Sequence, residues 1–219
     1  MYNFTFNIPT KIHFGKDTIS SLSELKAYGS KVLLVYGGGS IKKNGLYDTA
    51  MKILKDAGLT VFELSGVEPN PKIETVRKGV EICKNEGIDM VLAIGGGSTI
   101  DCSKVVAAGA RYDGDAWDLV LDGSKVKAAL PIFDVLTLSA TGTEMDPFAV
   151  ISDMSKNEKW GTGSPYMVPT MSILNPEYTF SVSKKQTAAG TADMISHICE
   201  NYFTNVKNAD VQARFAEGL

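Results

Sequence analysis

Residues 90–98 read MVLAIGGGS, and this stretch decides the fold class. A short run of apolar residues that breaks into glycines predicts a buried parallel strand, a tight turn and the start of a helix. Residues 32–40, VLLVYGGGS, repeat the pattern. One such unit is compatible with a plain turn. Two units in one chain favour an α/β parallel sheet that binds a nucleotide or dinucleotide.

The two glycine loops have the chemistry that a phosphate group needs. Glycine lets the backbone approach a ligand closely, and a helix N-terminus attracts an anion. We expect the serine that ends each loop to cap its helix. Neither loop has the G-x-G-x-x-G spacing of the common dinucleotide fingerprint. The candidate residues are Gly37, Gly38, Gly39 and Ser40 in the first loop and Gly95, Gly96, Gly97 and Ser98 in the second.

Composition narrows the function classes. The chain has 219 residues, 44% hydrophobic and 21% charged, which is ordinary for a globular protein of one large or two smaller domains. A net charge of −3 without a basic stripe argues against a nucleic-acid partner. The apolar runs are too short for a membrane span. Three widely spaced cysteines predict reduced thiols, so we expect a cytoplasmic protein.

Strands and helices are predicted to alternate along the first two thirds of the chain. A loosely alternating edge strand over residues 2–14 predicts pairing with a second subunit, hence a homodimer. Residues 152–170 are expected to form loops. Further strands are predicted at 32–36, 60–64, 90–94, 131–138 and 173–174, and helices at 17–26 (capped by Asp17), 46–56, 73–85, 99–110 and from Ser183 onward.

The pattern divides the chain into two domains. We expect residues 1–179 to form an α/β dinucleotide-binding domain and residues 180–219 to form the first helices of an α-helical one. About 40 residues lie at the lower limit of what folds alone. The last residues carry no helix stop signal, so the sequence is expected to be part of a longer protein.

Asp193 and His197 are candidate metal ligands. At positions i and i+4 of a helix they share one face, and carboxylate and imidazole both bind first-row metals. A surface ion pair has the same spacing. Two ligands alone do not make a metal site.

These motifs together resemble one family. Residues 95–104, GGGSTIDCSK, are similar to the G-G-G-S-x-x-D-x-x-K signature of the iron-containing (group III) alcohol dehydrogenases. Residues 9–16, 68–71 and 141–144 and the Asp193/His197 pair also resemble that family in order and spacing. The similarity is greatest to its butanol dehydrogenase and NADPH-dependent aldehyde reductase branch.

The resemblance implies a Rossmann-like parallel-sheet domain followed by an all-α domain, the dehydroquinate synthase-like fold. It implies that Asp193 and His197 bind Fe²⁺ or Zn²⁺ and that Asp101 braces the second glycine loop or touches the cofactor. The family uses two further histidines, which this sequence lacks, so either it is a fragment or the product is metal-incompetent. The resemblance also assigns cofactor contacts to Asn70, Thr137, Leu138, Thr141 and Lys159.

The implied reaction is hydride transfer between NADP(H) and a short or medium aliphatic alcohol or aldehyde. NAD-preferring relatives often have an aspartate at the position of Gly39, where its charge repels a 2′-phosphate. Glycine here, with two lysines nearby, favours NADP(H) over NAD(H). Two alternatives stay open: a dehydroquinate synthase-like lyase, and a non-catalytic NADP(H)-binding truncation product.

Overall fold

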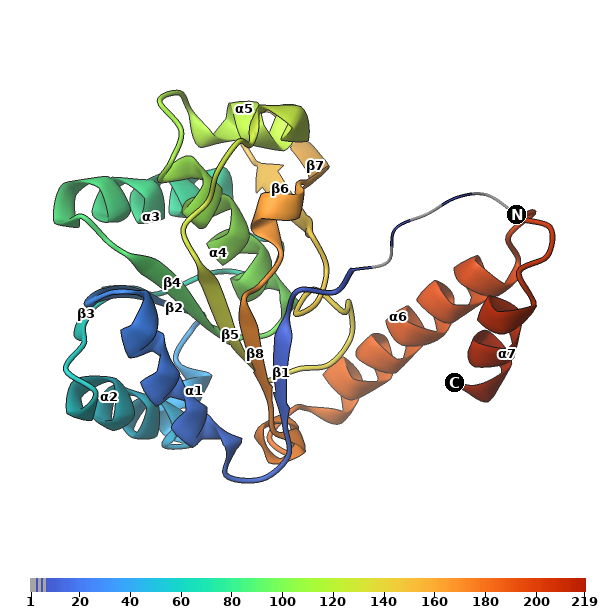
Figure 1. The fold of residues 1–219 in the computed structure, drawn as a ribbon, viewed down its shortest axis with the longest axis horizontal. Coiled ribbons are helices and arrows are strands. Elements are labelled where there is room, and N and C mark those ends of the chain that lie inside the picture. Colours follow the sequence, from blue (N-terminus) through green and yellow to red (C-terminus); the bar gives the residue numbers. More distant parts are fainter. Residues whose placement is uncertain (1–2, 4, 6) are drawn as a thin grey trace.

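A six-stranded parallel sheet forms the centre of the protein, as the computed structural model of residues 3, 5 and 7–219 shows. The strand order is β1-β8-β5-β4-β2-β3, and each neighbouring pair is parallel (Figure 1). The strands are β1 (Lys11–Phe14), β2 (Lys31–Tyr36), β3 (Thr60–Leu64), β4 (Met90–Gly95), β5 (Ile132–Leu136) and β8 (Met171–Leu174). A separate antiparallel hairpin consists of β6 (Phe148–Asp153) and β7 (Glu158–Gly163).

Helices cover both faces of the sheet, which explains why its central strand β4 is apolar throughout. On one face pack α3 (Ile73–Glu86), α4 (Gly97–Gly109) and α5 (Ala116–Leu121). On the other pack α2 (Leu46–Asp56) and a 3₁₀ helix over Thr18–Tyr28. Every residue of β4 is buried, and α4 is buried along nearly its whole length. This confirms the predicted α/β fold class.

The C-terminal segment projects from this body. Helix α6 (Lys184–Tyr202) leaves the carboxyl edge of the sheet, and α7 (Asp210–Gly218) folds back beside it (Figure 1). The Ser183 hydroxyl accepts a hydrogen bond from the Gln186 N–H at 3.2 Å, so Ser183 is the N-cap of α6. Among the described residues, no helix combines the length and the hydropathy that crossing a bilayer requires.

Most predicted elements are confirmed within two residues, but residues 152–170 are wrong as a loop. They contain β7 and the end of β6, whose strands pair from Phe148–Gly163 to Asp153–Glu158. The glycines of β7 removed the alternating apolar pattern by which a strand is recognised. The helical structure predicted from Ser183 onward is confirmed as α6 and α7, with a break between them, where Asn208 has a positive φ of 61°.

The predicted side-chain caps of three other helices are absent from the structure. Asp17 adopts a left-handed conformation with φ 61° and makes no cap hydrogen bond, and the helix that follows is 3₁₀. Gly39 and Gly96 occupy the N-cap positions of α1 (Ser40–Lys43) and α4, so neither Ser40 nor Ser98 caps its helix. Glycine, rather than the serine beside it, makes each turn.

The predicted edge strand is confirmed over the four residues of β1, which pairs with β8 and forms one edge of the sheet within the described part of the chain. Three of the residues in the longer stretch predicted there, Tyr2, Phe4 and Phe6, lie outside the described residues.

Candidate cofactor-binding site

The second glycine loop joins β4 to α4 at very close range. A Cβ atom on Gly95 would lie 2.4 Å from Thr99 Oγ1, so only glycine lets the strand approach the helix this closely. The Thr99 N–H donates to the Gly96 carbonyl at 2.9 Å, which starts the helix. The N–H groups of Gly97 and Ser98 precede any intrahelical acceptor. With the dipole of a 13-residue helix behind them, they are N–H groups of the kind that attract an anion.

The first glycine loop turns from β2 into α1, and Gly39 takes a φ of +98° there. The chain after β3 is tied to this loop by two backbone hydrogen bonds, from Gly66 N–H to Gly37 O and from Val67 N–H to Tyr36 O, both 3.2 Å. Because α1 has only four residues, this loop has no long helix dipole behind it. Its contribution is therefore open space next to the backbone.

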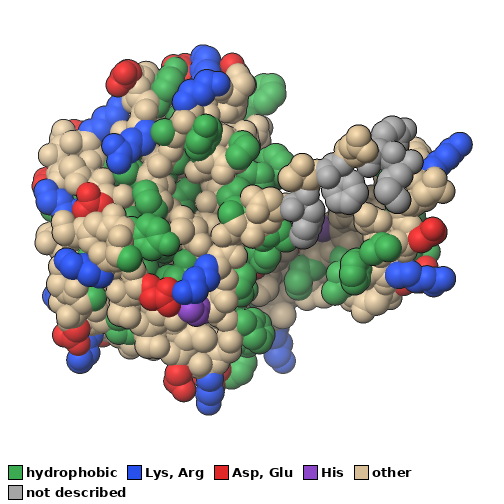
Figure 2. Space-filling model, viewed as in Figure 1, with side chains coloured by type: hydrophobic (Ala, Val, Ile, Leu, Met, Phe, Trp, Pro, Cys, Tyr) green, Lys and Arg blue, Asp and Glu red, His purple; other side chains and the backbone are tan. Residues whose placement is uncertain are grey.

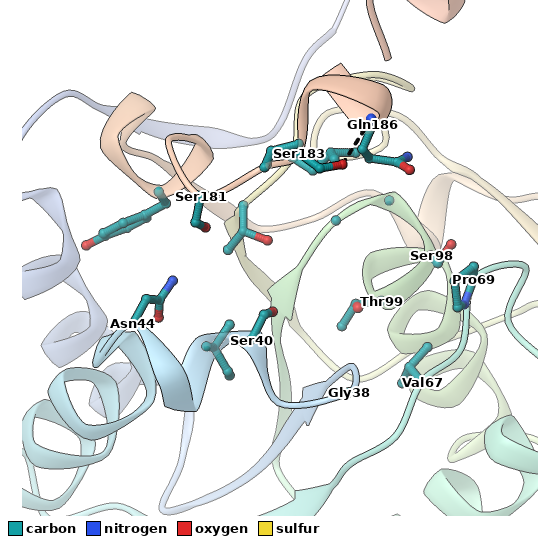
Figure 3. A pocket seen from close by; sticks show the side chains of 17 residues that line it. Gly38, Ser40, Asn44, Val67, Pro69, Ser98, Thr99, Ser181, Ser183 and Gln186 are labelled. Carbon is teal, nitrogen blue, oxygen red and sulfur yellow. Dashed lines mark hydrogen bonds between the residues drawn. The ribbon is translucent and has the colours of Figure 1, made fainter. Parts of the chain in front are cut away.

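Both loops open onto one pocket of about 510 Å³ at the carboxyl edge of the sheet. Figure 3 shows Gly38 and Ser40 on one side of this pocket, Ser98 and Thr99 on another, and Ser181 and Ser183 across from them. The end of β5 closes the pocket beside β4, since the Thr137 N–H donates to the Gly95 carbonyl at 2.9 Å. The predicted cofactor residues that line it are Gly38, Ser40, Gly96, Gly97, Ser98, Thr137 and Leu138.

The other predicted cofactor residues surround the pocket without lining it. Thr141 packs against the second glycine loop, because its Oγ1 would lie 2.9 Å from a Cβ on Gly97. Lys159 on β7 donates to Asn70 Oδ1 at 2.7 Å, which brings these two predicted residues together. Gly37, Gly39 and Gly95 belong to the two loops but are not among the residues that line the pocket.

Asp101 faces the segment that leads to β6. Its Oδ1 accepts a hydrogen bond from the Thr143 hydroxyl at 2.7 Å, and its Oδ2 accepts from the Val150 N–H at 3.0 Å. Burial raises the pKa of the Asp101 carboxyl, while these two hydrogen bonds oppose that rise. Both carboxylate oxygens are therefore engaged by protein groups.

Sequence reasoning missed one wall of the pocket. The segment from Tyr178 to Gln186 lies over the glycine loops, and Asn44 lines the pocket at the end of α1. The capping serine before α6 was the one local signal there, and it indicated a helix start rather than a pocket wall. The lining residues missed are Ile41, Asn44, Val67, Pro69, Thr99, Tyr178, Ser181, Val182, Ser183 and Gln186.

The candidate metal ligands lie on the exposed helix α6. Asp193 Oδ1 and His197 Nε2 are 3.7 Å apart on one helix face, and each side chain is about half exposed. The oxygen and nitrogen donors fit Fe²⁺ or Zn²⁺ in kind. The part of the chain that the structure describes contains no cluster of three or more His, Cys, Asp or Glu able to hold a metal ion. Among the described residues, this pair therefore falls short of the three protein ligands that a catalytic metal site uses.

Comparison with known proteins agrees with this geometry. The profile of the family described as "Iron-containing alcohol dehydrogenase" matches residues 9–176. The chain is 59% identical to NADH-dependent butanol dehydrogenase A of Clostridium acetobutylicum and 40% identical to NADPH-dependent aldehyde reductase YqhD of Escherichia coli. It is covered completely in both cases. It superposes on the crystal structure of NADH-dependent butanol dehydrogenase A from Thermotoga maritima with a TM-score of 0.95 and 48% identity.

The chain spans 57% of the length of the Clostridium and Escherichia relatives and 55% of the Thermotoga chain, while these cover all of it. The family profile covers both glycine loops, the Asp101 signature and Lys159. The fold, the two loops on one pocket and these matches lead to the same conclusion: the chain belongs to the iron-containing alcohol dehydrogenase family.

Proposed function

We propose that the protein carries out hydride transfer between a nicotinamide cofactor and an alcohol or aldehyde. One observation carries the proposal: both glycine loops leave the carboxyl ends of adjacent strands β2 and β4 and open onto a single pocket. The next long helices, α2 and α4, cover opposite faces of the sheet, so this pocket lies at a topological switch point, where open α/β sheets bind dinucleotides.

The cofactor is proposed to be NADP(H). The similar proteins are named both NADH-dependent and NADPH-dependent, so the proposal depends on the residues of this chain. Neither Asp nor Glu is among the residues that line the pocket, and Gly39 stands open at the tip of the first loop. A carboxylate 4 Å from a 2′-phosphate charge would cost about 4 kcal/mol at an effective dielectric of 20. Its absence here leaves a 2′-phosphate unopposed.

Asp193 and His197 are proposed to hold Fe²⁺ or Zn²⁺ together with further ligands of the longer protein. The metal supplies Lewis-acid polarisation of the substrate oxygen. Residues 180–219 would then be the first helices of an α-helical domain that faces the pocket. By analogy with the names of its relatives, the proposed substrate is a short or medium aliphatic alcohol or aldehyde. Because β1 lies at an edge of the sheet, it is the proposed contact of a homodimer.

The test is turnover by the intact protein isolated from its native source. Loaded with Fe²⁺ or Zn²⁺ and given NADP⁺ and butan-1-ol, it is expected to form NADPH, and removal of the metal by a chelator is expected to stop the reaction. Failure to form NADPH or NADH with any aliphatic alcohol, at saturating metal and cofactor, would refute the proposal.

A second candidate is a non-catalytic NADP(H)-binding protein, in which Asp193 and His197 form a surface ion pair on α6 and hold no metal. Tight binding of cofactor by the metal-loaded intact protein, with no turnover of alcohols or aldehydes, would support it. The remaining alternative is a dehydroquinate synthase-like lyase. Formation of dehydroquinate from a sugar phosphate substrate would support it.

A further inference from the structure

Lys104 is a charged side chain in the middle of the buried helix α4, and none of it is exposed. Its ammonium donates hydrogen bonds to Thr143 Oγ1, Asp146 O and Phe148 O, each at 2.8 Å, and to Asp146 Oδ1 at 2.9 Å. A buried charge is tolerated only where such partners replace water. All of these acceptors belong to residues 143–148, which run from the connection after β5 into the first residue of β6.

Asp101, one helical turn before Lys104, ties down the same segment. Thr143 accepts from Lys104 through Oγ1 and donates through the same atom to Asp101, 2.7 Å away. Asp101 also accepts from the Val150 N–H at 3.0 Å. Residues 143–150 are therefore bound to α4 through two neighbouring side chains of opposite charge.

Thr141 connects residues 143–150, which are bound to α4, with the cofactor pocket. The Thr143 N–H donates to Thr141 Oγ1 at 3.4 Å, and Thr141 packs on Gly97 at the N-terminus of α4. Thr137 and Leu138, a few residues earlier on the same connection, line the pocket. The position of this wall relative to the anion-binding turn thus depends on where α4 holds Thr143.

We propose that Lys104 is a positioning residue for the cofactor. It sets cofactor affinity from outside the pocket by holding residues 137–143 against the N-terminus of α4. The inference rests on the proposed function, because it concerns the affinity of that same pocket. Lys104 does not line the pocket, so its effect on the cofactor passes through Thr143 and Thr141.

The test replaces Lys104 by methionine, which has a similar length and no charge, in the intact protein. The Kd for NADPH, measured by fluorescence titration, is expected to rise about tenfold or more. The KM for the alcohol at saturating cofactor is expected to stay within about twofold, because the wall in question contacts the cofactor rather than the metal ligands. A folded Lys104→Met protein with an unchanged NADPH Kd would overturn the proposal.

Two further variants separate positioning from loss of stability. Val105→Ala, at the next buried position of α4, removes core packing without touching the polar contacts, so it is expected to lower the unfolding midpoint while leaving the NADPH Kd unchanged. Thr143→Val keeps the shape and removes the shared hydroxyl, and is expected to raise the Kd less than Lys104→Met does. If Lys104→Met does not fold, an unchanged Kd in Thr143→Val overturns the inference.

The two proposals fail in different ways. If the unmodified protein binds neither NADPH nor NADH, the proposed function is wrong. If it binds cofactor, and Val105→Ala weakens binding as much as Lys104→Met or Thr143→Val, the function stands and the positioning role of Lys104 is wrong.

Discussion

Lys159 donates a hydrogen bond from Nζ to Oδ1 of Asn70 at 2.7 Å, across 89 residues of sequence. Lys159 belongs to β7, and Asn70 follows β3 in a left-handed conformation with φ 54°. The contact joins the hairpin to the loop that runs from β3 past the first glycine loop. It also brings together two residues to which the family resemblance assigns cofactor contacts.

If Lys159 reaches the cofactor ribose, Asn70 orients its ammonium. Replacing Lys159 by methionine is then expected to raise the NADPH Kd about tenfold, and Asn70→Ala is expected to raise it less. The double variant should lose less NADPH binding free energy than the sum of the two single losses. The expected difference is about 0.5–1.5 kcal/mol, the net contribution of one hydrogen bond. Lys156→Met, in the turn of the same hairpin, is the control. Additive effects would show that the two residues act independently.

Gly39 is expected to decide between the two nicotinamide cofactors. Gly39→Asp places a carboxylate at the loop tip and is expected to weaken NADPH binding about tenfold or more while changing NADH binding little. The positive φ of 98° strains any side chain, so Gly39→Asn is the matched control, with equal strain and no charge. Cofactor titrations of both variants measure the effect. Equal losses of NADPH affinity in Asp and Asn variants would mean that strain, rather than charge, is responsible.

His197 is expected to be needed for the metal and not for the cofactor. His197→Ala in the intact protein should lower the affinity for Fe²⁺ or Zn²⁺ by about 100-fold or more and abolish turnover, with the NADPH Kd unchanged. Glu200→Gln removes an exposed carboxylate from the same helix and serves as control. Metal content after dialysis and cofactor titration measure the two effects. Full metal content in His197→Ala would mean that His197 is not a metal ligand and that it forms only a surface ion pair with Asp193 in the unmodified protein.

Asp134 is expected to make stability fall with rising pH. It is buried in β5, where burial raises the pKa of its carboxyl well above the ordinary value of 3.8. The folded state therefore keeps a proton that the unfolded state loses, so stability is highest below that ordinary value and falls as pH rises toward the raised pKa. Its Oδ2 lies 2.6 Å from Ser172 Oγ, and Ser172 Oγ lies 2.7 Å from the Glu144 carbonyl. A protonated Asp134 can donate to Ser172, which then donates onward to Glu144.

Asp134→Asn keeps this chain of donors without an ionisable group. The variant is expected to match the unmodified protein near pH 4 and to be more stable at pH 8, by about 1.4 kcal/mol for each unit by which the Asp134 pKa is raised within that window. Urea unfolding at a series of pH values measures it. Ser172→Ala, which breaks the chain but retains the carboxyl, should be destabilised and still lose stability as pH rises. Parallel pH profiles for Asp134→Asn and the unmodified protein would contradict the assignment.

Short stretches of the amino-acid sequence are enough to predict those strands and helices that depend on neighbouring residues. The apolar runs before the two glycine loops identified β2 and β4, and the spacing of apolar residues predicted α2 over Leu46–Asp56 to the residue. Strand and helix periods are local properties, so they can be read without knowing what packs against them. The hairpin of β6 and β7 was missed because its stability comes from cross-strand pairing, and its glycine-rich sequence lacks the alternating pattern that predicts a strand.

The surroundings of the two glycine loops depend on how distant parts of the chain pack together. The wall from Tyr178 to Gln186, the contact of Lys159 with Asn70, and the burial of Lys104 among residues about 40 positions away join distant parts of the chain. No local pattern records which acceptor a lysine will meet, because that depends on how the helices and strands pack. The sequence shows that Lys104 follows the second glycine loop. The fold shows that its charge is buried and which segment it holds.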